Sequence, residues 1–415
     1  MANVIEDVTC AGCCCVCDNI QITTDGTQIL NVQTTCSQGR SWFEQFGQTD
    51  PLLPLIDGRT VSHSDAVQQA VDLIHLSKAP LIWGMSQSST DSNRAAVALA
   101  DQIGATIDTA ASSNVRALQQ VGEASCTLGE VRSRADLIIY WGADALLTNH
   151  CHRETLLAGH EEFPRTIVSM GTKTPESSED VDKSIQVEAQ NTFEVIWYLR
   201  GLLKGIDFHE GESAGAYISD LKELVSLIQQ SKYIVFFFGP EFKQGHLSHR
   251  DIEALSILVR EIQADRRCHT ISVPPASDTK GVEHVLAWQT GYAANVNFAA
   301  GYPRYFPIEF SASQLIQRGE IDLCVLVGAQ PLSGLSKEAQ KYLTEVPTIL
   351  VGPAKVDDLD LNVYIPTGVY GIHFPGSIYR IDGTPLPLRG LVSTNLLSEA
   401  DVLTDITSFL KQTPV

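Results

Sequence analysis

Short apolar segments alternate with amphipathic helical segments from about residue 57 onward, and this pattern restricts the fold more than any other feature. Segment 92–104, for example, has apolar residues at helical spacing and stops at Gly104. Apolar strands bounded by Gly and Pro and separated by helices predict βαβ units with buried parallel sheets. We therefore expect an α/β fold whose strands lie in segments 79–85, 135–143, 166–171, 232–240, 268–275, 321–329 and 347–353.

The first 56 residues have a different character. They are rich in cysteine, and segment 19–34 reads as a hairpin that turns at Asp25-Gly26. Pro51 and Pro54 interrupt any regular element and mark a boundary. A chain of 415 residues exceeds one ordinary core and predicts two or three domains, and no repeat of solenoid length is present.

The composition restricts the possible partners. The formal net charge is −20, and no cluster of Lys and Arg stands out that would bind phosphate backbones or an anionic membrane. No apolar run approaches the length of a membrane helix. The N-terminus carries Glu6 and Asp7 and no apolar leader, so we expect a cytoplasmic protein with reduced thiols.

Several predicted strands end in glycine, at Gly84, Gly142, Gly171, Gly239, Gly328 and Gly352. Ligands of open α/β sheets bind beyond the carboxyl ends of strands, where glycine allows close approach of a backbone. A tight turn from strand to loop explains each glycine equally well. None of them belongs to a Gly-rich dinucleotide fingerprint or a P-loop.

Six cysteines lie in the N-terminal region, and four of them form the pattern C-x2-C-x3-C-x18-C: Cys10, Cys13, Cys17 and Cys36. Four thiolates at such spacing favour a 4Fe–4S cluster. Zinc is an alternative, although it usually takes two C-x2-C pairs and only one is present. An empty or incompletely occupied site is the third reading, and Cys14 or Cys15 is either a substitute ligand or a small buried residue.

The other four cysteines are scattered in or beside apolar segments. We expect them to be core thiols: Cys126, Cys151, Cys268 and Cys324.

Nearly the whole chain resembles the B subunit of formylmethanofuran dehydrogenase, a tungsten or molybdenum subunit related to formate dehydrogenase. The resemblance rests on "VTCAGCCCVCDNI" (8–20), "LIWGMSQSS" (81–89), residues 117–142, the aromatic segment "WQTGYAANVNFAAGYPRYFP" (288–307) and "GSIYRIDGTPLPLRG" (376–390). It implies a Cys-rich cluster domain at 1–56, a discontinuous α/β domain at 57–130 and 285–415, and an inserted α/β domain at 131–284. It also implies that the β-barrel of related enzymes lies on a separate D subunit. This agrees with the sequence, which leaves no room for a barrel.

The chain departs from the family where the chemistry is expected. The loop that should hold a metal-binding Cys followed by His-Gly-Pro reads "DTAASSNVRALQQVG" (108–122) and has no Cys, His or Pro. Ser112 or Ser113 is an alternative oxygen ligand, but a serine pair that opens a helix is more simply an N-cap. The segment expected to supply an anion-holding Arg offers only Lys280, which does not replace a bidentate Arg.

The two loops that bind the pterin in the family have also changed. A G-x-N-P motif has become Gly142-Ala143-Asp144-Ala145, and a D-P-R motif has become Ser169-Met170-Gly171-Thr172. An acidic Asp144 is the wrong charge beside a pyrophosphate, and the lost Asp removes a partner for guanine. The resemblance therefore implies no catalytic or pterin-binding residues and no molybdenum or tungsten pterin.

These changes match the B subunit of the bacterial formyltransferase/hydrolase complex, which releases formate from formyl-tetrahydromethanopterin without redox chemistry. We expect a redox-inactive scaffold that binds the A, C and D subunits of such a complex, with the aromatic segment shaping an interface. Two alternatives stay open. One is an active metal-pterin dehydrogenase subunit with rearranged ligands that reduces CO2 to formate, and the other is an electron-transfer module in which the cluster alone matters.

Overall fold

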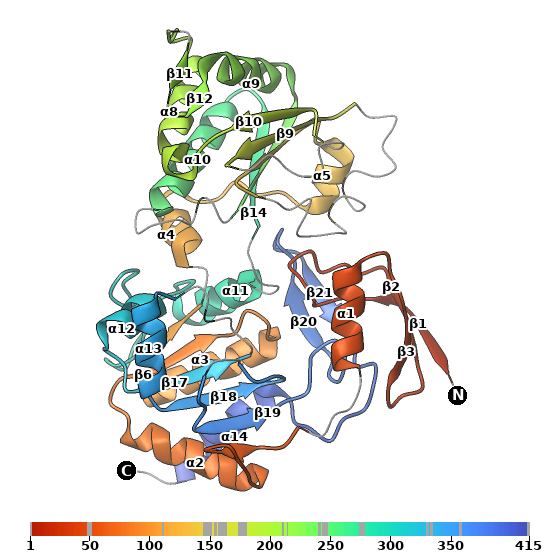
Figure 1. The fold of residues 1–415 in the computed structure, drawn as a ribbon, viewed down its shortest axis with the longest axis vertical. Helices are drawn as coiled ribbons and strands as arrows, with labels where there is room; N and C mark the ends of the chain where they lie inside the picture. Colours follow the sequence, from red (N-terminus) through yellow and green to blue (C-terminus); the bar gives the residue numbers. More distant parts are fainter. Residues whose placement is uncertain are drawn as a thin grey trace. The chain divides into compact units, whose positions relative to one another are not determined.

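The computed structural model divides the chain into two compact units, each of which is described by itself (Figure 1). Unit 1 comprises Met1–Ser112 and Ala276–Val415, and unit 2 comprises Ser113–Pro275. The three-domain division made from the sequence stays a prediction. The structure describes residues 2–47, 52–109, 112–143, 152, 156, 164–172, 181–209, 211–213, 215–239, 242, 248–273, 279–328, 332, 335–356 and 359–412.

Unit 1 contains a mixed sheet whose central five strands are parallel, in the order β7-β6-β17-β18-β19. Short antiparallel strands extend it at both edges. From one edge of the sheet to the other, the strands are β16 (Arg304–Tyr305), β15 (Val296–Asn297), β7 (Thr106–Asp108), β6 (Pro80–Gly84), β17 (Leu323–Val327), β18 (Thr348–Gly352), β19 (Val363–Pro366), β4 (Leu55–Ile56) and β5 (Arg59–Thr60).

Helices cover both faces of this sheet, because alternate side chains of each strand point to opposite faces. One core joins Ile82, Val325 and Ile349 to four helices: α2 (His63–Leu76), α3 (Thr90–Ile103), α11 (Thr279–Thr290) and α14 (Glu399–Gln412). The other core joins Leu81 and Leu350 to α12 (Ala312–Arg318) and α13 (Lys337–Glu345). Unit 1 is therefore doubly wound, and its βαβ units with a parallel central sheet confirm the alternating sequence pattern.

The Cys-rich segment forms an antiparallel sheet of β1 (Asn3–Val8), β2 (Ile20–Thr24) and β3 (Ile29–Gln33), followed by α1 (Ser37–Phe46). The hairpin between β2 and β3 turns at Asp25-Gly26 as predicted, and the Asp25 carboxylate accepts hydrogen bonds from the backbone N–H groups of Thr27 and Gln28. A second hairpin of unit 1 consists of β20 (Gly376–Tyr379) and β21 (Pro385–Leu388).

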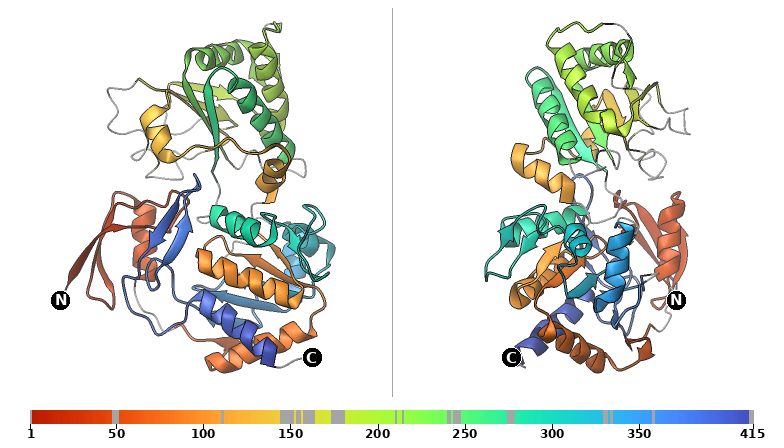
Figure 2. Two further views of the ribbon diagram at one scale, coloured as in Figure 1. Left: turned by 180° about the vertical axis from the view of Figure 1, so that it is seen from behind. Right: turned by 60° about the vertical axis from the view of Figure 1, so that its left-hand side comes forward.

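Unit 2 contains an all-parallel five-stranded sheet in the order β10-β9-β8-β13-β14. Figure 2 gives two further views of this unit, in yellow and green. One face packs on α8, α9 and α10 through residues such as Ile139, Phe236 and Leu255. The strands are β10 (Lys183–Gln186), β9 (Thr166–Gly171), β8 (Leu137–Trp141), β13 (Tyr233–Phe238) and β14 (Arg267–Ser272). The other elements are α4 (Ser112–Val121), α5 (Leu128–Arg134), η2 (Ala189–Asn191), α8 (Thr192–Leu203), the β11 (Glu212–Ser213)–β12 (Ala216–Tyr217) hairpin, α9 (Ile218–Gln230) and α10 (Ser248–Ile262).

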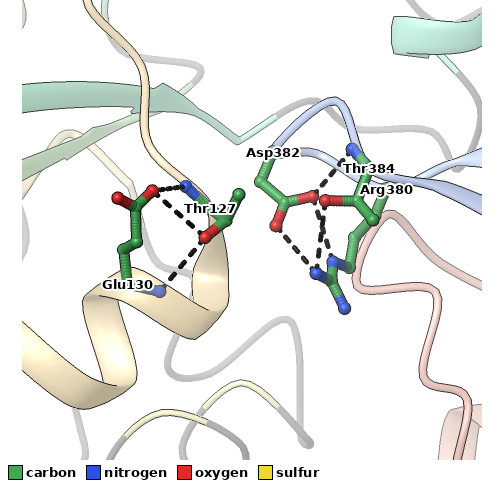
Figure 3. A network of polar contacts seen from close by, with 5 residues as sticks. All are labelled: Thr127, Glu130, Arg380, Asp382 and Thr384. Carbon is green, nitrogen blue, oxygen red and sulfur yellow. Dashed lines mark hydrogen bonds and ion pairs between the residues drawn. The ribbon is translucent and has the colours of Figure 1, made fainter.

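Local sequence signals fix several helix ends. The predicted stop of helix 92–104 is confirmed, because Gly104 ends α3 in the left-handed conformation at φ 67°. Helix α5 begins with a capping box between Thr127 and Glu130, whose backbone and side-chain hydrogen bonds are drawn in Figure 3. No helix in the described part of the chain combines the length and the apolar character that crossing a bilayer requires.

Candidate functional site

The cysteine loop between β1 and β2 is folded back on itself by backbone hydrogen bonds. The N–H of Cys10 donates to the carbonyl of Cys17 at 2.8 Å, and the N–H of Val16 donates to the carbonyl of Cys13 at 3.2 Å. Val16 is fully buried and has a positive φ of 42°, which is unusual for a β-branched residue. The loop is therefore held in a strained, compact conformation by its surroundings.

The hairpin of β20 and β21 supplies much of that support. The N–H of Ile381 donates to the carbonyl of Cys14 at 3.2 Å, and Val16 packs against Ile378 and Leu388 of the hairpin. The turn is stiffened by a bidentate ion pair in which Arg380 donates to the buried carboxylate of Asp382 at 3.0 and 2.9 Å (Figure 3). Two segments of the family resemblance, residues 8–20 and 376–390, thus form one structural unit.

Cys10 and Cys36 share the environment that cluster ligands need. Cys36 caps α1, and its sulfur accepts a hydrogen bond from the Gly39 N–H at 3.2 Å. The sulfur of Cys10 accepts one from the Gly12 N–H at 3.4 Å. A Cβ on Gly39 would lie 3.5 Å from the Cys10 sulfur and 3.6 Å from the Cys36 sulfur. Both sulfurs therefore face the same point of α1, and amide donors of this kind stabilise cluster-bound thiolates.

The remaining cysteines of the loop are close to one another. Contacts with the thiols of Cys13 and Cys14, together with burial, raise the pKa of Cys15 well above its usual value. Cys13 and Cys17 are half-buried, while Cys14 and Cys15 are buried. In the part of the chain that the structure describes, no three His, Cys, Asp or Glu side chains are arranged to hold one metal ion. The ligand set Cys10, Cys13, Cys17 and Cys36 therefore stays a prediction.

The scattered cysteines behave as predicted wherever they are described. Cys126, Cys268 and Cys324 are buried, and burial raises the pKa of Cys324 to about 12. Cys151 lies outside the described residues.

The loop expected to carry the metal ligand is anchored by Asp108, which the sequence reasoning missed. This carboxylate ends β7 and accepts hydrogen bonds from the backbone N–H groups of Thr109 (2.8 Å), Asn295 (3.2 Å) and Ala312 (2.8 Å). Burial raises the pKa of Asp108 to about 7 despite these donors. Its fixed position joins the start of segment 108–122 to the aromatic segment and to the first turn of α12. The side chains of Ser112 and Ser113 are not among those that the structure describes.

Lys280, the one cation that the sequence offered in place of the missing Arg, lies in the first turn of α11. Its Nζ is 3.4 Å from Oε2 of Glu283, and the two side chains are only 10% and 5% exposed. A buried lysine paired with a carboxylate one turn away is electrically compensated. It is therefore poorly suited to hold an anionic substrate.

The aromatic segment 288–307 divides into a buried part and an exposed part. Tyr292 and Tyr305 stack at 5.2 Å with an interplanar angle of 10°. Trp288, Tyr302 and Phe306 are instead 54%, 59% and 53% exposed, which is high for large aromatic side chains. The segment thus contains one stacked aromatic pair and presents three other large aromatic side chains to solvent.

The switch point of unit 2 lies between β8 and β13, where a parallel sheet normally binds its ligand. Here the two strand ends are in direct contact. A Cβ on Gly239 would lie 2.5 Å from the carbonyl oxygen of Gly142 and 2.6 Å from Cα of Ala143. Trp141 packs edge-on against Phe242 at 5.4 Å beside them. At the described positions, the backbones of the two strand ends are therefore in close contact, with the Trp141 and Phe242 rings beside them.

The two altered pterin loops flank this point. The Gly142 N–H donates to the carbonyl of Met170 at 2.7 Å, and Met170 is buried. Gly171 has a φ of 152°, which fits its position at the end of β9. Asp144 and Ala145 lie outside the described residues.

The switch point of unit 1, between β6 and β17, holds a buried acid that the sequence reasoning also missed. Glu399 opens α14, is 2% exposed and lies beside Gly328 and the hydroxyl groups of Ser88 and Ser92. Burial raises the pKa of Glu399 to about 7, while the neighbouring hydroxyls act in the opposite direction. A lone Glu at a helix start is too common to be recognised from sequence.

The chain is similar in sequence to two archaeal proteins over nearly its full length. The chain is 29% identical to the B subunit of the tungsten-containing formylmethanofuran dehydrogenase 2 of Methanocaldococcus jannaschii, over 94% of each chain. It is 25% identical to the corresponding protein of Methanococcus maripaludis, over 96% of this chain and 97% of the relative. No protein-family model matches the chain.

Two solved structures have the same fold. One is a chain of the formyltransferase/hydrolase complex (FhcABCD) from Methylorubrum extorquens in complex with methylofuran, with a TM-score of 0.72, 23% identity, and 86% of this chain and 99% of that chain covered. The other is acetylene hydratase from Pelobacter acetylenicus, with a TM-score of 0.70, 10% identity, and 98% and 69% covered. These likenesses confirm the predicted α/β fold of the molybdopterin-enzyme type.

Proposed function

Because the chain belongs to the family of formylmethanofuran dehydrogenase B subunits, we propose that it is the B subunit of a formyltransferase/hydrolase-type complex and serves there as a redox-inactive scaffold. Such a complex releases formate from formyl-tetrahydromethanopterin by transfer and hydrolysis. The observation that carries the proposal is the close packing of Gly239 on Gly142 and Ala143 at the ends of β8 and β13, the point at which a sheet of this kind would bind a ligand.

The lost reactive groups support the same conclusion. Reversible CO2 reduction on a metal-pterin needs a metal ligand, a proton-transfer group and a cation for the carboxylate. Segment 109–122 has neither Cys nor His, and Lys280 is paired with Glu283 in a buried site. The residues present do not fit a bis-pterin metal centre.

The partners that we propose are the A, C and D subunits of the complex, with the hydrolytic A subunit on the aromatic segment. Trp288, Tyr302 and Phe306 are more than half exposed, and the rings of Trp288 and Phe306 lie 6.3 Å from Tyr379 and 5.6 Å from Phe310. Rigid aromatic groups lose little conformational freedom on binding and are frequent anchors of interfaces. Their survival beside a degenerate loop supports a role in contact rather than in catalysis.

We propose that the N-terminal site holds a 4Fe–4S cluster on Cys10, Cys13, Cys17 and Cys36. The amide donors to two of the sulfurs and the shared position at Gly39 support this assignment. A bound cluster would supply a one-electron couple. In this chain we assign it a structural role, because the N-terminal sheet has a small core of its own that a covalent staple would stabilise.

A second candidate function is an active tungsten or molybdenum subunit that reduces CO2 to formate. The similarity over nearly the full length to two tungsten-containing archaeal subunits favours it.

One experiment separates the two functions. The chain is purified within its complex, its iron, sulfide, tungsten, molybdenum and pterin contents are measured, and formate release from formyl-tetrahydromethanopterin is assayed without an electron acceptor. We expect iron and sulfide near four per chain, no pterin metal, and redox-independent formate release. Stoichiometric tungsten or molybdenum with pterin would refute the scaffold and support the dehydrogenase.

The proposed interface is tested by Trp288→Ala and Phe306→Ala. Loss of a central aromatic anchor weakens binding by about 2 kcal/mol or more, which is about 30-fold in Kd for the A subunit. Leu76→Ala is the matched control, since Leu76 is 79% exposed on α2 and lies outside the aromatic segment. Equal affinity of all three variants for the A subunit would show that the aromatic segment is not part of the interface.

A further inference from the structure

One buried carboxylate closes a loop of unit 1 that contains two of the exposed aromatic residues. Asp108 is 1% exposed; its Oδ1 accepts the backbone N–H of Asn295 at 3.2 Å, and its Oδ2 accepts the backbone N–H of Ala312 at 2.8 Å. Three large apolar side chains between these two donors are about half exposed: Tyr302, Phe306 and Ile308. Both ends of the 296–311 loop are therefore bonded to a single side chain.

The start of the loop has an unusual backbone conformation. Asn295 is fully buried and has a φ of 53°, in the left-handed region that Asn adopts more readily than most residues. The next two residues form β15, which pairs with β7 through Val296 opposite Ile107. The hydrogen bond to Asp108 thus holds the chain at the point where it enters the sheet.

The end of the loop depends on Asp108 because α12 has no side-chain cap of its own. Ser311 occupies the N-cap position but makes no capping hydrogen bond, and its hydroxyl lies 3.0 Å from that of Ser313. The first N–H of α12, that of Ala312, bonds to the Asp108 carboxylate instead. A carboxylate suits this position because a helix N-terminus carries a partial positive charge.

A second set of contacts leads from β7 to the exposed ring of Phe306. Nδ2 of Asn297 donates to the Thr106 hydroxyl at 2.8 Å, and Oδ1 of Asn297 accepts from Nη2 of Arg304 at 2.7 Å. The Arg304 guanidinium lies 5.4 Å from the centroid of the Phe310 ring, which meets the Phe306 ring edge-on at 5.6 Å. Direct contacts therefore connect the exposed ring to the strand that ends in the buried carboxylate.

We infer that Asp108 is a positioning residue for partner binding: by closing the 296–311 loop, it holds Tyr302 and Phe306 in the arrangement that the A subunit contacts. The inference rests on the proposed function, in which the A subunit binds the aromatic segment. A loop that is ordered before binding loses little conformational entropy when the partner docks, so opening one end lowers the affinity. Because Asp108 is itself buried, it acts only through the loop.

Asp108→Asn opens the loop with almost no change of side-chain shape. The amide has one acceptor oxygen and one NH2 group, so one end of the loop must face a donor in place of an acceptor. Hydrogen exchange of the backbone N–H groups in 296–312 should become about tenfold faster, and the Kd for the A subunit should rise about tenfold. Circular dichroism verifies that the variant is folded.

Asp322→Asn is the matched control, because it makes the same chemical change elsewhere in unit 1. The Asp322 carboxylate accepts the backbone N–H groups of Lys78 and Ala79 at 2.8 and 2.9 Å, outside the aromatic segment. This variant should change the Kd for the A subunit less than about twofold.

A double-mutant cycle separates positioning from a general loss of stability. When Tyr302 and Phe306 are both alanine, Asp108→Asn should change the Kd less than about threefold, whereas in Trp288→Ala it should keep its tenfold effect, because Trp288 precedes the loop. Equal effects in the two backgrounds, or a Kd of Asp108→Asn equal to the native value, overturn the inference and leave the proposed function standing. A native chain that does not bind the A subunit overturns both.

Thr106→Val gives the measurement if Asp108→Asn does not fold. Valine keeps the shape of threonine and removes only the hydroxyl that accepts from Asn297. Exchange in 296–312 should again become faster, and the Kd for the A subunit should rise about threefold. A Kd equal to the native value overturns the inference.

Discussion

Replacing Gly239 by alanine tests the contact on which the proposed function depends. The new Cβ would lie 2.5 Å from the Gly142 carbonyl oxygen, 2.6 Å from Cα of Ala143 and 2.8 Å from its Cβ. Cβ atoms do not approach other heavy atoms so closely, and two of these three atoms are backbone. The ends of β8 and β13 must therefore separate before the methyl group fits.

The cost follows from the same distances. Overpacking a core by a methyl group costs about 1–3 kcal/mol, and rigid backbone neighbours place Gly239→Ala at the upper end. Alanine also reduces the conformational entropy of the unfolded chain, which offsets about 0.4–1 kcal/mol of this cost. The net loss is about 2 kcal/mol, and for a unit of this size each 1 kcal/mol lowers Tm by about 2–4 °C. We therefore expect Tm of unit 2 to fall by roughly 4–8 °C.

Differential scanning calorimetry of the full chain measures this shift, and Gly129→Ala is the matched control. A Cβ on Gly129 meets only the Thr127 hydroxyl, at 3.8 Å, on the exposed side of α5. Alanine there should raise stability by about 0.5–1 kcal/mol. If Gly239→Ala is as stable as the native chain, the strand ends are not in contact. The crevice would then have room for a ligand, and the main support for the scaffold would be lost.

Three further predictions concern other parts of the chain. Cys17→Ser should lower the iron content of the purified complex and the Tm of unit 1, and an unchanged iron content and Tm would contradict an occupied cluster. The pKa of Glu399 is raised to about 7 in the folded chain, so the folded state binds the extra proton and stability falls as pH rises from about 4.5 to 7, by up to roughly 3 kcal/mol. Urea unfolding at several pH values should show a smaller loss in Glu399→Gln than in the native chain, because Asp108, whose pKa is also raised to about 7, titrates in both; parallel curves would contradict the role of Glu399. Ser112→Ala and Ser113→Ala should leave the rate of formate release by the complex unchanged, whereas a large loss would show that the altered loop still takes part in the reaction.

Much of the fold follows from local patterns. The apolar strands, the hairpin at Asp25-Gly26 and the end of α3 at Gly104 are confirmed, because each depends on neighbours within a few residues. The burial of Cys126, Cys268 and Cys324 in the core also follows from the apolar segments around them. The cysteine spacing predicts a ligand set, but spacing alone does not fix which sulfurs face one another.

What only the tertiary structure decided depends on pairs of residues far apart in the chain. Nothing in the sequence distinguishes Asp108 from the other Asp residues; only the folded chain brings its carboxylate to the N–H groups of Asn295 and Ala312. In the same way, only the folded chain brings Gly239 against Gly142, which belongs to another βα unit. The sequence by itself predicts an α/β chain with buried parallel sheets, because strand and helix patterns are local, while the change of the catalytic motifs stays a prediction from the family resemblance. How closely the strand ends at Gly142 and Gly239 pack depends on contacts between distant segments, and such contacts exist only in the folded chain.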